Sequence, residues 1–237
     1  MKRIIAALIV LTFLMVSPYT TSAQSAKYYF DKGVDIAYQV GLGYLFGHVD
    51  EKNFEKNLNE AIWNLNKAIE LNPRYAEAYY ERGQCYILLG KDQEAVSDHK
   101  KAVEIYIISG NYYYTEGKNQ EAVSTYTKAI ELNPKYAKAY YNRGNVYCDL
   151  GKYQEAINDC TKAVEINPKH ASAYINRGYA YDQLGKHQEA ISDYTKAIEI
   201  DPKYALAYNN RGFAYKKLGR EKEASQDFDK AKSLRKQ

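Results

Sequence analysis

The chain has 237 residues, of which 26% are charged, and its formal net charge at pH 7 is +4. So small a positive balance argues against nucleic acid as the partner. Five prolines and the lack of a stretch rich in serine and glycine indicate a folded chain without a long linker.

Residues 1–23 have the pattern of a secretory signal peptide. A short positive start is followed by an apolar stretch, 4–16, that only Thr12 interrupts, and small residues precede a cleavage site between Ala23 and Gln24. This stretch is shorter than the roughly 20 residues that span a bilayer, so an uncleaved N-terminal anchor is the less favoured alternative. We therefore expect an exported protein, periplasmic or secreted.

The rest of the chain, residues 24–237, repeats one pattern. The string Gly-Lys-Tyr-Gln-Glu-Ala begins at Gly151, and related strings begin at Gly185 and Gly219. A fixed spacing of 34 residues is typical of a solenoid, in which each unit packs only on its neighbours. Small and apolar residues recur at spacings of three and four, which indicates two amphipathic helices per unit. The glycine between them suits a left-handed turn.

The unit at 137–170 shows the pattern most completely. Its marker residues are Tyr140, Gly144, Tyr147, Gly151, Ala156, Ala163 and Pro168, at places 4, 8, 11, 15, 20, 27 and 32 of the unit. This pattern resembles the tetratricopeptide repeat (TPR), a helix-turn-helix unit. The resemblance implies an all-α fold, a right-handed α-solenoid of about six repeats whose first helices line a concave side. The repeats are expected at about 26–75, 76–102, 103–136, 137–170, 171–204 and 205–237.

The first repeat is longer than the pattern requires. If Ala61 holds place 20, the second helix begins near Leu58 and a 16-residue insertion precedes it. The insertion is apolar and contains glycines, among them Gly41 and Gly47. Such a loop either packs against the first part of the groove or is offered to a partner, and the sequence leaves both open.

The second repeat is shortened. Its turn string begins at Gly90 and the next begins at Gly117, so seven residues of the 34-residue period are missing, including the inter-repeat proline. Seven residues are about two helical turns. We therefore predict that the helix beginning near Asp92 continues without a break towards Glu116, the alternative being a break at Ser109 and Gly110 into two short helices.

Places 7 and 23 indicate an ion pair inside four of the hairpins. Four repeats carry Arg at place 7 and Asp at place 23, whereas one repeat has Ser109 and Thr125 there instead. Joint loss of both charges favours contact across the hairpin and a structural role. The alternative is that the arginines line a site for anions. The expected pairs are Arg82–Asp98, Arg143–Asp159, Arg177–Asp193 and Arg211–Asp227.

Side chains on the expected concave face suggest peptide binding. Asn142, Asn176 and Asn210 share place 6, and a row of side-chain amides can pair with the backbone of an extended peptide. The alternative is that these asparagines are ordinary solvated residues. The other groove candidates are Asn145, Asn209, Lys138, Tyr141, Asp149, Asp182, Gln183, Lys216 and Lys217. A carboxylate clamp, known in related repeats, needs lysine at place 5, and no repeat has one there.

The sequence contains no recognisable catalytic motif. The four histidines have no metal-ligand spacing, and no phosphate loop or nucleophile motif occurs. We expect a non-catalytic chain with no cofactor and no metal site. Cys85 and Cys160 fall on core places, Cys148 is less clear, and three cysteines cannot all pair within one chain.

The sequence therefore predicts a protein–protein interaction scaffold that binds an extended peptide or loop in the concave groove. Its partner is expected to be a protein or peptide, not a nucleic acid or a small-molecule substrate. The alternative is a structural role, in which an uncapped last repeat, 205–237, supports a homo-oligomer or a cell-envelope assembly.

Overall fold

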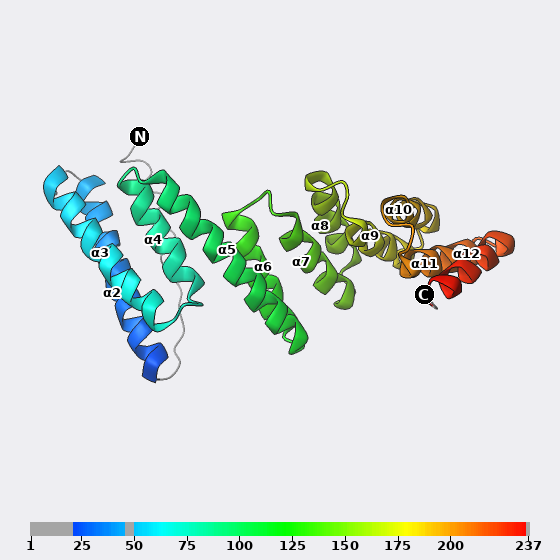
Figure 1. Cartoon of the computed structure of the whole chain (residues 1–237), viewed down its shortest axis with the longest axis horizontal. Helices are drawn as coiled ribbons and strands as arrows, with labels where there is room; N and C mark the ends of the chain where they lie inside the picture. Colours follow the sequence, from blue (N-terminus) through cyan, green and yellow to red (C-terminus); the bar gives the residue numbers. More distant parts are fainter. Residues whose placement is uncertain (1–20, 46–49, 236–237) are drawn as a thin grey trace. The chain divides into compact units, whose positions relative to one another are not determined.

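The computed structural model describes residues 21–45 and 50–235, and every regular element in these ranges is an α-helix (Figure 1). The helices are α2 (Thr21–Leu45), α3 (Glu51–Leu71), α4 (Ala76–Leu88), α5 (Asp92–Thr115), α6 (Asn119–Leu132), α7 (Ala137–Asp149), α8 (Tyr153–Ile166), α9 (Ala171–Gln183), α10 (His187–Ile200), α11 (Ala205–Lys217) and α12 (Glu221–Leu234). In these ranges no helix is both long and apolar enough to cross a membrane. Most of the predicted signal peptide, residues 1–20, lies outside the described residues.

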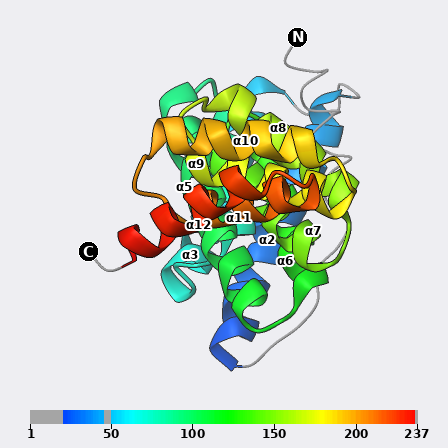
Figure 2. The same ribbon diagram turned by 90° about the vertical axis from the view of Figure 1, so that its right-hand side faces the viewer.

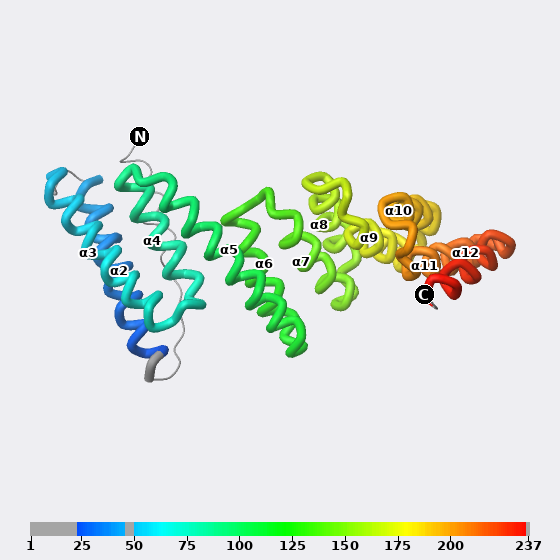
Figure 3. The backbone as a smooth tube through the Cα atoms, in the orientation of Figure 1, coloured from blue at the N-terminus to red at the C-terminus, as the bar shows by residue number. Residues whose placement is uncertain are grey.

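The described residues separate into two compact units, one that ends at Tyr106 and one that begins at Ile107, and the boundary falls inside α5. In the first unit α2 packs along α3, and α3 packs on α4 (Figure 3). Its core is formed by apolar side chains such as Phe30, Leu58 and Leu65, each at most 4% exposed. Cys85 is buried in the same core and is a free thiol.

The described residues of the insertion are mostly helical, whereas the sequence suggested an apolar loop. Residues 41–45 are the last turn of α2, and α3 begins at Glu51 rather than near Leu58. The early start has a local cause, because Asp50 is the N-cap and its Oδ1 accepts a hydrogen bond from the backbone N of Asn53 at 2.9 Å.

Aromatic packing explains why both helices are longer than expected. Phe54, which is buried in the first turn of α3, lies with its ring centroid 4.3 Å from that of Tyr44 at the end of α2. The insertion thus adds a further layer of contact between the two helices. Gly47 and His48 lie outside the described residues.

The shortened second repeat produces the continuous helix that was predicted. α5 spans 24 residues, and Ser109 and Gly110 lie inside it. In the second unit Gly110 faces Tyr126 of α6, where a Cβ would come 2.5 Å from the ring. Tyr126 also donates a hydrogen bond to Oδ1 of Asn111 at 2.7 Å. The last part of α5 therefore serves as the first helix of the hairpin that α6 completes.

The second unit continues with three regular hairpins, α7–α8, α9–α10 and α11–α12. Each second helix contacts the first helix of the next hairpin, and the first helices α7, α9 and α11 contact one another in turn. Figure 2 shows α11 and α12 lying side by side. The hairpin turns use Gly151 and Gly185 with φ of 69° and 75°, the left-handed conformation that was predicted. Cys148 and Cys160 are buried free thiols.

Candidate functional site

The four predicted Arg–Asp pairs are all present. In each pair Nε and Nη2 of the arginine donate to the two carboxylate oxygens of the aspartate at 2.6–2.8 Å. The aspartate side chains are 8% exposed. Such bidentate bonds fix the angle between the helices of a hairpin. None of these four guanidinium groups is left open for an anion, so the geometry favours a structural role for these residues.

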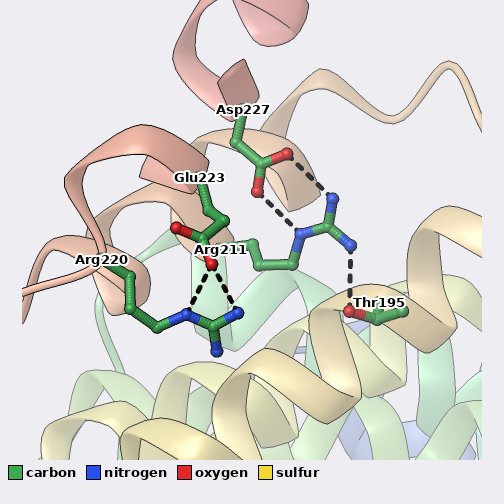
Figure 4. Close-up of polar contacts among 5 residues, drawn as sticks. All are labelled: Thr195, Arg211, Arg220, Glu223 and Asp227. Carbon is green, nitrogen blue, oxygen red and sulfur yellow. Dashed lines mark hydrogen bonds and ion pairs between the residues drawn. The ribbon is translucent and has the colours of Figure 1, made fainter. Parts of the chain in front are cut away.

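Each of these arginines also links its hairpin to the preceding one. Arg211 donates from Nη1 to Oγ1 of Thr195 on α10 at 2.9 Å while its other nitrogens hold Asp227 (Figure 4). Equivalent bonds join Arg177 to Thr161 and Arg143 to Thr127. The hydrogen bond to Asp227 raises the pKa of Arg211, so the guanidinium stays charged. These contacts make the register between repeats specific.

Two of the amides predicted to bind a peptide donate to other asparagine side chains instead. Nδ2 of Asn142 donates to Oδ1 of Asn111 at 3.0 Å, and Nδ2 of Asn176 donates to Oδ1 of Asn145 at 2.9 Å. Both bonds join place 6 of one repeat to place 9 of the repeat before it. Two of the three amides of the predicted row are therefore partly used inside the protein, between neighbouring first helices.

Tyr114, an off-pattern tyrosine that the sequence suggests as an exposed contact anchor, instead extends this network. Tyr114 accepts a hydrogen bond from Nδ2 of Asn145 at 2.9 Å and donates to Asp149 at 2.5 Å. Burial, together with the bond to Asp149, raises the pKa of Tyr114 to about 12. The roles of Asn111 and Tyr114 could have been found from the repeat spacing. Their partners lie 31 or 35 residues further along the chain, which is three residues less or one residue more than one repeat.

Asp182 forms a separate polar cluster on the next first helix. It is 9% exposed, and its two oxygens contact Nδ1 of His187 at 2.7 Å and Nζ of Lys217 at 2.8 Å. The bond to Lys217 ties α9 to α11. Asp182 is therefore satisfied by the protein itself and contributes to repeat stacking.

The remaining candidates lie on the surface without joining these networks. Tyr141 is half-buried and packs on His170, with ring centroids 4.7 Å apart. Lys138 and Lys216 are exposed. The side-chain amides of Asn209 and Asn210 on α11 have no hydrogen-bond partner within the described residues.

Two aromatic side chains break the polar pattern of place 9. Where earlier repeats of the second unit have Asn111 and Asn145, the last two have Tyr179 and Phe213, which are 39% and 51% exposed. Tyr179 lies edge-on to Tyr153, with centroids 6.2 Å apart. The surface of α9 and α11 therefore combines exposed aromatic rings with unpaired amides. Within the described ranges no group of His, Cys, Asp and Glu side chains could hold a metal ion.

Family models match most of the repeated region. Models of the tetratricopeptide repeat match residues 76–106, 135–203 and 193–226, and a TPR repeat model matches residues 55–90 and 110–151. Together with the helix pairs, the marker glycines and the Arg–Asp pairs, these matches show that the chain belongs to the tetratricopeptide-repeat family. Its fold is an all-α solenoid of helix-turn-helix repeats, and proteins of this family generally act as interaction scaffolds.

Two solved structures, those of YrrB and MamA, share this fold, and a third is similar to half of the chain. YrrB, described as a TPR protein with an unusual peptide-binding site, is 26% identical, covers 72% of this chain and 91% of its own, and has a TM-score of 0.53. MamA (41-end) from Desulfovibrio magneticus RS-1 is 20% identical over 91% of this chain and 98% of its own, with a TM-score of 0.50. The first TPR domain of Spaghetti (RPAP3), bound to an HSP90 peptide, is 32% identical over 49% of this chain and 93% of its own, with a TM-score of 0.49.

Proposed function

We propose that the chain binds an extended segment of another protein along the exposed side of α9 and α11. The observation that carries this proposal is that exposed Tyr179 and Phe213 lie on the same two helices as Asn210, whose side-chain amide has no hydrogen-bond partner within the described residues. Aromatic rings supply rigid contact area, and free amides can pair with a peptide backbone whatever its sequence. The peptide-binding site named for YrrB, which shares the fold, supports the choice of a peptide as the ligand.

The binding surface proposed here differs from the row of amides suggested by the sequence. Asn142 and Asn176 donate to neighbouring asparagines, so a peptide would have to compete with bonds already made. The repeat before Asn210 has Tyr179 at place 9, where the earlier repeats have an amide, and the side chain of Asn210 makes no hydrogen bond within the described residues. The row is therefore useful to a partner mainly at its C-terminal end.

The test is to select peptides from a displayed library against the whole chain and to measure their affinity by isothermal titration calorimetry. The Tyr179→Ala/Asn210→Ala variant is expected to bind the selected peptides at least about tenfold more weakly, since truncating a central aromatic anchor often removes about 2 kcal/mol. Gln188→Ala, at an exposed place on the second helix α10, is the matched control and should bind like the wild type.

Two results would contradict the proposal. One is a library that yields no peptide, and the other is a set of peptides whose affinity is the same for the double variant and the wild type. Circular dichroism of each variant checks that the helices are retained.

Export remains a second proposal, and its support is the N-terminal sequence alone. Cleavage between Ala23 and Gln24 would remove the first three residues of α2, which begins at Thr21. N-terminal sequencing of the chain recovered from the source cells should begin at Gln24. A chain that retains residues 1–23 would show that the signal is not cleaved and would leave the anchor as the explanation.

A further inference from the structure

Within the described residues, no further helix covers the outer face of the hairpin formed by α11 and α12. This end face consists of Asn209, Phe213, Phe228, Ala231, Lys232 and Arg235. It contains a hollow of about 390 Å³, and Ala231, which lines the hollow, is only 3% exposed. Phe213, beside it, packs edge-on to Phe228 with ring centroids 5.0 Å apart and remains 51% exposed.

In the preceding hairpin the same places are covered by a helix. Tyr194 and Ala197 correspond to Phe228 and Ala231, are at most 1% exposed, and lie in one cluster with Ala207 and Ala214 of α11. Those two alanines are seven residues apart and fully buried. In the same way α9 buries Ala173 and Ala180, also seven residues apart. A helix with two small residues at this spacing is therefore the shape that such a face accepts.

The end face differs from its internal counterparts by being charged and polar. Lys232 replaces Ile198, and Asn209 replaces Ile175, which is 3% exposed in its own repeat. Residues 205–235 contain eight Lys or Arg against four Asp or Glu, whereas residues 171–204 contain four against five. Within the part of the chain that the structure describes, the side chains of Lys232 and Arg235 make no hydrogen bond or ion pair. The face therefore complements carboxylates.

The internal interface shows where those carboxylates would lie. Ile198 clusters with Tyr204 and Ala207, at the start of α11, so Lys232 would meet the first turn of a docked helix. Acidic residues are also favoured there by the helix dipole.

Asp229 of α12 indicates where a docked helix would carry a positive charge. It holds the place of Thr195, whose Oγ1 accepts from Arg211 at the seventh residue of α11. A basic residue at the seventh position of a docked helix would therefore meet the Asp229 carboxylate.

We propose that the end face binds an α-helix of a partner protein with acidic residues in its first turn, small residues at its third and tenth positions, and a basic residue at its seventh. A second copy of this chain fits poorly. Its first helix, α2, has Tyr28 and Asp35 at the places of the small residues and Lys27 in the place of an acid. Two end faces meeting would bring Lys232 and Arg235 of both copies together.

The test uses two stapled helical peptides of thirteen residues, the length of α11. Stapling is needed because so short a helix is marginal alone. Both peptides carry alanine at positions three and ten. One has glutamates in the first turn and arginine at position seven, and the other has these charges exchanged. Fluorescence anisotropy with the whole chain is expected to show about tenfold tighter binding of the first peptide, weakening with salt.

A charge-exchanged protein makes the test reciprocal. In Asp229→Lys/Lys232→Glu/Arg235→Glu the preference between the two peptides should reverse, and because all three residues are exposed the fold should be kept. The matched control, Lys196→Glu/Glu199→Lys, exchanges an exposed pair on α10 and should leave the preference unchanged. Equal affinity for both peptides, or no binding at about 1 mM, would overturn the proposal. So would concentration-dependent dimers in sedimentation velocity that the charge exchange abolishes, since these would assign the face to a second copy.

Discussion

Removing only the arginine of the Arg177–Asp193 pair is expected to lower the free energy of unfolding more than removing both side chains. Arg177 donates to the two oxygens of Asp193 at 2.8 and 2.7 Å and to Thr161 at 3.2 Å. Burial raises the pKa of Asp193, and Arg177 counteracts that rise. Replacing Arg177 by serine leaves a carboxylate that is 8% exposed without its cation, which should destabilise the fold by about 3–5 kcal/mol.

The chain itself supplies the design of the double variant. Arg177→Ser/Asp193→Thr copies Ser109 and Thr125 of the hairpin that lacks the pair, where Thr125 donates to the backbone O of Glu121 at 2.7 Å. The double variant buries no unpaired charge. It should therefore lose only about 2 kcal/mol, for the missing hydrogen bonds and the packing of the arginine stem.

Urea unfolding of the wild type, the two single variants and the double variant, followed by circular dichroism, measures the four free energies. We expect a coupling energy of about 2 kcal/mol or more between the two sites. Additive losses, equal within about 0.5 kcal/mol, would refute the reasoning, because they would mean that the two charges do not depend on each other in the folded chain.

Two further predictions concern single buried groups. Burial raises the pKa of Glu81 from 4.5 to about 8, so the folded chain keeps a proton that the unfolded chain releases above about pH 4.5. Stability should be greatest below that pH and fall as the pH rises towards 8, by several kcal/mol at about 1.4 kcal/mol per unit of pKa shift. In urea unfolding at about pH 5 and pH 8, Glu81→Gln should lack this loss, and an equal pH dependence of both proteins would contradict the prediction. Gly178→Ala should cost about 1–3 kcal/mol in thermal unfolding, because a Cβ would lie 2.8 Å from the buried ring of Tyr194. Gly185→Ala is the comparison: its Cβ would meet no atom within 4 Å, but φ of +75° is unfavourable for alanine, so it should lose only about 1 kcal/mol. An unchanged melting temperature of Gly178→Ala would contradict the prediction, because it would show that Tyr194 can move aside.

The repeat pattern could be predicted from the sequence because it is written several times in one chain. The period located the helices, and the joint replacement by Ser109 and Thr125 exposed the Arg–Asp contact without any structure. The unbroken α5 followed from counting the missing residues. The seven absent residues include the inter-repeat proline, so the residue that would end the helix is gone, and their number is about two helical turns.

The long first repeat was harder to predict because glycine was taken as a helix breaker. Gly41 and Gly43 cost about 1 kcal/mol each in a helix, yet both lie within α2. The packing of Tyr44 on Phe54 and the cap at Asp50 favour helix here, and neither is visible as a period. Tertiary contact therefore outweighed local propensity.

The candidate site was predicted as a set of residues but not as a network. The sequence placed the asparagines on one face correctly, but whether Asn176 reaches a ligand or Asn145 depends on the distance between two helices. Exposed Phe213 and the unpaired Lys232 could be recognised only by comparing each repeat with the structure of the one before it.

The most direct test of the proposed binding surface is site-specific photo-crosslinking in the source cells. A photo-reactive amino acid replaces Tyr179 on α9 in one strain and Gln188 on α10 in another, and mass spectrometry identifies the crosslinked peptides. The account predicts that position 179 captures one defined segment of a partner protein, which position 188 does not capture and which Asn210→Ala reduces. Identical crosslinks from the two positions, or none from position 179, would contradict it.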